Sequence, residues 1–141
     1  MSGLINSAGS KSGVIGITEL NYEEGEWTPV VANLNDAVIT IYDADYRVFG
    51  DLVIAHFAIL INSTSDASAI NLSFPFTCNV LSGSGSYQGG FLTYNNSGQD
   101  IAPVISAGAS TAHFFTSSGG YGSYVGHSTD VLSGTVIYIR A

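Results

Sequence analysis

The sequence predicts an all-β protein, an antiparallel β-sandwich or jelly-roll-like domain with a short extended N-terminal arm. Short runs rich in Val, Ile, Thr and aromatic residues recur about every ten residues, as in sandwich domains. Seventeen glycines and nineteen serines separate these runs. No window combines a helix-capping residue with an apolar stripe of helical period. Together these observations favour short strands joined by tight turns.

The predicted strands follow one another from Trp27 to the end of the chain. The clearest pair flanks Gly50-Asp51, a typical two-residue hairpin turn. The run at 52–61 is apolar at nearly every position, which places it inside a sandwich or at a subunit interface. It is also too short to span a membrane as a helix. The predicted strands are 27–31, 37–42, 46–49, 52–61, 69–74, 87–94, 101–106, 111–116 and 131–140.

Composition limits the classes of partner. The chain has 141 residues, which suits one domain, and a formal net charge of −8. Its 45% hydrophobic content excludes a solvated disordered chain. The three basic residues, Lys11, Arg47 and Arg140, form no patch, so nucleic-acid binding is not expected. A small, charge-poor chain with so much apolar surface is expected to form oligomer contacts.

Residues 1–26 differ from the predicted β-domain at 27–141. They are rich in glycine and serine and lack a strand or helix period, which is typical of an extended arm. Aliphatic residues are nevertheless interleaved with the glycines, and an idle soluble tail has no need of them. We therefore interpret the segment as an attachment arm that docks into a groove or onto neighbouring subunits. The predicted anchors are Leu4, Ile5, Val14 and Ile15.

The sequence contains no convincing catalytic, cofactor or metal site. Asp43 and Asp45 have the spacing of neighbours on one strand face, but turn residues exposed to solvent are the simpler interpretation. His56, His113 and His127 have no second ligand at metal-binding spacing, and His56 is expected in the core or an interface. The single cysteine, at position 78, excludes an intramolecular disulfide and is expected as a small buried hydrophobe. We expect no enzymatic activity.

A loop rich in tyrosine and glycine is the best candidate for recognition. Residues 117–130 interleave Tyr, Gly and Ser, as antibody paratopes do. Tyr121 and Tyr124 could stack on sugar faces, with Ser123 or His127 supplying a polar contact. Tyr87 and Tyr94 flank other loops and could add to the same surface. The alternative is that these rings pack on a neighbouring subunit.

Five segments also resemble a known β-rich module of bacteriophage virion appendages. The opening Y-E-E-G-E-W-T-P at 22–29 resembles the Y-E-E-G-x-W-T-P opening of that module. Residues 46–53 resemble its Y-x-x-x-G-x-x-V hairpin, and 74–77 its L-P-F-T strand end. Residues 133–139 are similar to its S-G-T-Y-I finish, and 4–16 to its leader. The five segments occur in the same order and span most of the chain.

This resemblance implies a homotrimeric tail-fibre, head-fibre or decoration protein. The arm would bind other virion proteins, and the β-domain would project toward the host surface, where a glycan is a possible ligand. The protein would be made in the host cytoplasm and located in the virion. The module has no shared catalytic residues, so none is transferred to this chain. The alternative function is a stand-alone lectin-like carbohydrate-binding module.

Overall fold

The computed structural model describes residues 21–32, 38–63, 69–80, 87–116 and 128–141. These residues form an all-β structure in which every strand pairing is antiparallel, and no helix occurs among them. The predicted all-β class is therefore confirmed. The strands are β1 (Tyr22–Glu26), β2 (Val31–Ala32), β3 (Val38–Phe49), β4 (Leu52–Ser63), β5 (Asn71–Ser73), β6 (Tyr87–Asn95), β7 (Ile101–Ser106), β8 (Thr111–Thr116) and β9 (Val131–Ile139).

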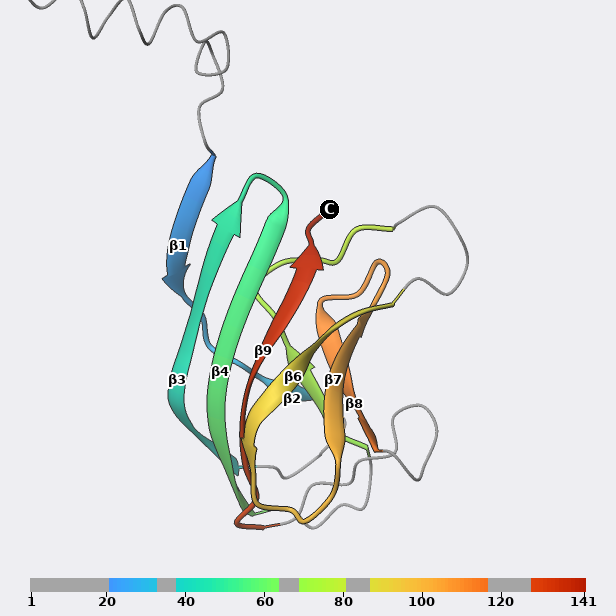
Figure 1. The fold of residues 1–141 in the computed structure, drawn as a ribbon. Coiled ribbons are helices and arrows are strands. Elements are labelled where there is room, and N and C mark those ends of the chain that lie inside the picture. The colour runs from blue at the N-terminus through green and yellow to red at the C-terminus, as the bar shows by residue number, and fades with distance from the viewer. Residues whose placement is uncertain (1–20, 33–37, 64–68, 81–86, 117–127) are drawn as a thin grey trace, which may run out of the picture.

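The nine strands belong to one curled sheet with the order β1-β3-β4-β9-β6-β7-β8-β5-β2. The two edge strands, β1 and β2, are consecutive in the chain. Figure 1 shows β3, β4 and β9 side by side, with β6, β7 and β8 following to the right of β9. Between the edges, the Trp27 amide donates to the Ala44 carbonyl at 3.1 Å, and the Ser73 amide donates to the Val30 carbonyl at 2.9 Å. The short segment at 27–30 therefore connects the two edges of the curled sheet.

The predicted hairpin at Gly50-Asp51 is confirmed. It joins β3 to β4, with Phe49 paired to Leu52. Gly50 has a φ of 63°, which only glycine adopts readily in such a turn. The strands predicted from Tyr87 onward also agree with β6 to β9 to within one residue at each end.

β3 differs from its prediction, because the segments expected as two strands form one. A bulge between Ile41 and Asp43 leaves Tyr42 without a cross-strand partner. The extra residue changes which alternate positions pair with the buried residues of β4, from Ile41 opposite Ile59 before it to Ala44 opposite Phe57 after it. The interpretation of Asp43 and Asp45 as turn residues is therefore wrong, since both lie within this strand.

The first two strands also differ from the prediction. β1 lies within the range assigned to the arm and pairs with β3, so the described part of the sheet already includes Tyr22, ahead of the predicted start at Trp27. In place of a strand at 27–31, only Val31 and Ala32 pair, with β5. The half-buried Trp27 ring instead packs on Phe74, with ring centroids 5.8 Å apart, and its indole N–H donates to the Ser73 carbonyl at 3.2 Å. The tertiary contacts of this ring replace strand pairing here.

The core lies on the inner face of the curled sheet. Alternate residues of β4 and β9, such as Phe57 and Val136, are fully buried there. Phe57 makes edge-on ring contacts with Phe74 and Phe114, at centroid distances of 6.0 and 6.1 Å. The contact between Phe57 on β4 and Phe114 on β8 joins two strands that are far apart in the strand order of the sheet. Burying such rings stabilises the fold.

Candidate functional site

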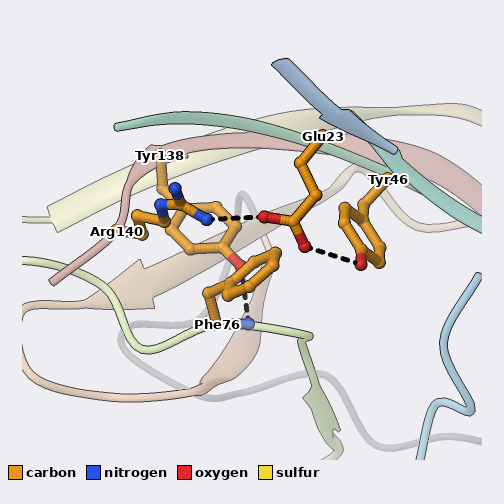
Figure 2. Close-up of polar contacts among 5 residues, drawn as sticks. All are labelled: Glu23, Tyr46, Phe76, Tyr138 and Arg140. Atoms are coloured by element: carbon orange, nitrogen blue, oxygen red, sulfur yellow. Dashed lines mark hydrogen bonds and ion pairs between the residues drawn. The ribbon is translucent and has the colours of Figure 1, made fainter. Parts of the chain in front are cut away.

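A group of polar and aromatic side chains gathers at the end of the sheet near the β3–β4 turn (Figure 2). We name Glu23, Tyr46, Phe76, Tyr138 and Arg140 the Glu23 cluster. The Glu23 carboxylate accepts a hydrogen bond from the Tyr46 hydroxyl and pairs with the Arg140 guanidinium, each at 3.0 Å. The Arg140 guanidinium also lies over the Phe76 ring, 5.2 Å from its centroid. The cluster thus ties the edge strand β1 to the end of β9.

The geometry of the Glu23 cluster indicates a structural role. The Tyr46 ring packs against Gly25, where an added Cβ would lie 2.8 Å from the hydroxyl oxygen. It also meets Phe76 edge-on, with centroids 5.1 Å apart. The hydrogen bond to Glu23 raises the pKa of Tyr46. The buried Tyr138 hydroxyl accepts a hydrogen bond from the Phe76 amide at 3.2 Å, and burial raises its pKa.

Four of the five segments that carry the resemblance meet in this cluster. Glu23 and Gly25 come from 22–29, Phe76 from 74–77 and Tyr138 from 133–139, and Tyr46 begins a fourth segment at 46–53. The residues that make these segments recognisable therefore hold one end of the sheet together. A recognition surface has to be sought elsewhere on the molecule.

The opposite end of the sheet holds the base of the predicted tyrosine and glycine loop. The chain enters that loop after Thr116 and leaves it at Ser128 (Figure 1). Thr129 has a φ of 78°, and its amide donates to the Ile61 carbonyl at 2.7 Å. The Asn96 amide group donates to the Thr129 carbonyl at 3.1 Å and accepts from the Val131 amide at 2.7 Å. The chain is therefore firmly fixed where the loop ends.

A pocket of about 280 Å³ lies at the end of β8, where the chain leads into this loop. Its lining combines apolar surface with one exposed carboxylate and one hydroxyl group. Such a lining suits a ligand with both an apolar face and hydroxyl groups. The lining residues are Asp100, Ile101, Ala102, Phe115 and Thr116. No sequence motif marks this pocket, because its lining residues at the facing ends of β7 and β8 are ordinary strand and turn residues and only their packing forms the hollow.

The predicted binding residues lie outside the described residues. These are Tyr121, Ser123, Tyr124 and His127 for the glycan, and Leu4, Ile5, Val14 and Ile15 for attachment. The two tyrosines expected to add to the surface are both described and exposed, Tyr87 at the start of β6 and Tyr94 near its end.

The remaining titratable residues are dispersed over the sheet. His56 is half-buried on the outer face of β4 rather than in the core, with its Nδ1 3.4 Å from the Thr135 hydroxyl. Burial lowers the pKa of the half-buried His113 on β8. Asp45 pairs with Arg47 at 3.2 Å on the same face as Asp43. Within the described ranges, no three His, Cys, Asp or Glu side chains come together in a way that could hold a metal ion.

Cys78 lies in the core, as its sequence context predicts. The side chain is fully buried and accepts a hydrogen bond from the Gln88 amide group at 3.0 Å. Burial raises the pKa of its thiol, which disfavours the reactive thiolate. We therefore assign Cys78 a packing role.

Comparison with known proteins identifies no relative of this chain. No family model, curated protein or solved structure matches the chain. The part of the chain that the structure describes also contains no helix with the length and apolarity needed to cross a membrane.

Proposed function

We propose that this chain is a structural and adhesion protein of a bacteriophage particle, located in the virion and assembled as a homotrimer. The observation that carries the proposal is the position of the described residues that adjoin the two predicted binding segments. The described chain begins beside the Gly50-Asp51 turn, whereas the 117–127 loop joins the sheet beside Ile61 and Ile101. From Leu52 to Ile61, β4 extends about 30 Å at ~3.3 Å per residue. This separation suits a protein that attaches at one end and contacts its host at the other.

We further propose that the curled sheet is a sandwich of the jelly-roll kind. The inner faces of its two halves pack on each other through Phe57, Phe74 and Phe114. Its edge strands, β1 and β2, are joined directly by residues 27–30. Both features support a sheet folded over on itself, which is the arrangement that sandwiches use to bury apolar inner faces.

The arm is the proposed attachment segment, with Leu4, Ile5, Val14 and Ile15 binding other virion proteins. A truncated chain that begins at Asn21 retains every described strand, so it should fold. It should then fail to assemble onto particles, as measured by particle composition after complementation. A full-length variant with the four aliphatic residues changed to serine provides the matched control for chain length. Normal incorporation of both variants would contradict the role of the arm.

The loop at the opposite end is the proposed recognition segment for a neutral host glycan. The net charge of −8 disfavours an anionic polysaccharide, since like charges repel. The double variant Tyr121→Ala with Tyr124→Ala should reduce adsorption to host cells and leave stability within about 1 kcal/mol, as for surface substitutions. Tyr42→Ala is the matched control, because Tyr42 is 60% exposed on β3. If the double variant instead dissociates the oligomer, these rings form an interface.

A reconstruction of the intact particle tests the proposed function directly. Density for the chain should appear on a virion appendage or on the capsid surface. A protein that is absent from purified particles and binds glycan on its own would favour the lectin-like alternative.

A further inference from the structure

The outer face of the central strands presents apolar side chains to solvent. Cross-strand pairing places Tyr22, Phe49, Leu52 and Ile139 in one row across β1, β3, β4 and β9. The next row pairs Ile54 with Ile137, and Phe91 on β6 lies opposite Thr135, diagonally across from Ile137. We name these seven residues the outer apolar face. Phe91 is 53% exposed and Ile137 is 41% exposed, although Ile137 belongs to a central strand.

The size of this face matches one side of a protein interface. Its three aromatic rings are 39–53% exposed, and an aromatic side chain has roughly 200 Å² of surface to bury. With the four aliphatic residues, the exposed apolar area reaches about 500 Å², near the upper end of patches seen on monomers. Adding the polar rim approaches the roughly 800 Å² that each partner buries in a standard interface.

We propose that a second copy of this chain packs on the outer apolar face, with Ile137 and Phe91 near its centre. This proposal deepens the proposed homotrimer and rests on it. The rim along β1 and β3 carries both signs of charge, with Glu24 and Glu26 near Arg47. The Arg47 side chain pairs with Asp45 of its own chain and is still 52% exposed, so its guanidinium can also meet a carboxylate of a second copy. The same carboxylates disfavour an anionic lipid surface as the occupant.

Pairing through the sheet edge is the competing mode of association, and the sequence of β1 opposes it. This edge strand contains Glu23, Glu24 and Glu26 within five residues. Charged residues disfavour the addition of another strand at this edge, and the other edge strand, β2, is only two residues long. Contact through the outer apolar face is therefore the favoured mode of association, because removing its apolar side chains from water lowers the free energy.

Cysteine labelling maps the contact without disrupting it. Cys78 is fully buried, so the wild-type chain gives a low background with a maleimide reagent. Ile137→Cys places a thiol on the outer apolar face, and Val80→Cys is the matched control at a 66% exposed position that is not one of the seven residues of that face. We expect the thiol at position 137 to react at least about tenfold more slowly than the thiol at position 80, because an interface excludes the reagent. Equal labelling rates in an assembled protein would overturn the proposal.

A charge substitution then tests whether the face is needed for assembly. Light scattering of the full-length wild-type chain should give a multiple of 14.7 kDa. Ile137→Glu should shift the protein to the monomer mass with unchanged circular dichroism, whereas Val80→Glu should remain assembled. If both variants stay assembled, the proposal for this face fails and the homotrimer stands. If the wild-type chain is itself monomeric, the homotrimer fails and the interface with it.

Discussion

The inner and outer faces of the same strands carry similar residues in different environments. On β4, Phe57 is fully buried on the inner face, whereas Ile54 on the outer face is only half-buried. On β9, the inner Val136 is fully buried and its neighbour Ile137 is 41% exposed. Burial of the inner face is completed within the chain by the curl of the sheet. The outer face can be buried only by another molecule, and this difference points to association.

Truncation of one apolar side chain on each face should give the largest difference in the free energy of unfolding. Phe57→Ala should lower the free energy of unfolding by about 3–5 kcal/mol, because it leaves a cavity among packed rings. Ile54→Ala should cost only about 1 kcal/mol in a monomer, since its side chain is half-buried. Urea unfolding at several protein concentrations measures both costs. A cost at Ile54 that grows with concentration would show that the outer face is covered in an assembly.

The neighbouring glycines of β6 offer a second comparison. A Cβ at Gly90, which pairs with the inner Val136, would lie 1.8 Å from the Thr135 carbonyl oxygen. Gly90→Ala should therefore force β6 away from β9 and cost about 1–3 kcal/mol, as overpacking does. At Gly89 the corresponding contact is 3.0 Å, to the Pro103 carbonyl oxygen, so Gly89→Ala should cost less. Equal thermal stabilities of the two variants would contradict the close approach of β6 to β9.

Alkaline pH separates a buried tyrosine from an exposed one. Burial raises the pKa of the inner Tyr138 above its ordinary value of 10.0. The native state therefore holds this proton more tightly than the unfolded state does, and stability falls as pH rises above about 10, by about 1.4 kcal/mol per pH unit. Tyr138→Phe should remove much of this dependence. Tyr22→Phe, on the outer face, should leave most of it, as urea unfolding between pH 9 and about 11 can measure.

Substitution of two neighbouring glutamates on opposite faces of β1 should give the smallest difference in stability. Glu23 binds both Tyr46 and Arg140, whereas the side chain of Glu24, on the opposite face of β1, accepts a hydrogen bond from Tyr22. Glu23→Gln should cost less than about 1 kcal/mol, since these pairs are partly exposed, and it should lower the pKa of Tyr46 towards its ordinary value. Ultraviolet titration of the tyrosines detects this change. The Tyr46 titration should not change in Glu24→Gln.

Much of the fold could be predicted because local signals and the global structure agree. The hairpin at Gly50-Asp51 was predictable since a turn that requires positive φ carries its own sequence signature. β7 and β8 were predictable from their apolar and β-branched residues. β1 was missed because its residues, Y-E-E-G-E, resemble a solvated linker, and only pairing with β3 makes them a strand. The bulge at Tyr42 was missed because it interrupts the alternation on which strand prediction depends.

The sequence by itself determined the all-β class, the main hairpin, the strands from Tyr87 onward and the burial of Cys78, because these follow from spacing and composition along the chain. Only the tertiary structure decided which side chains meet. Glu23 and Arg140 are 117 positions apart, yet they pair because β1 begins and β9 ends at the same end of the curled sheet. The distinction between Phe57 and Ile54 likewise has no local signal, since both are apolar residues of one strand. Which face became the core depended on how the sheet curled, and that is a property of all nine strands together.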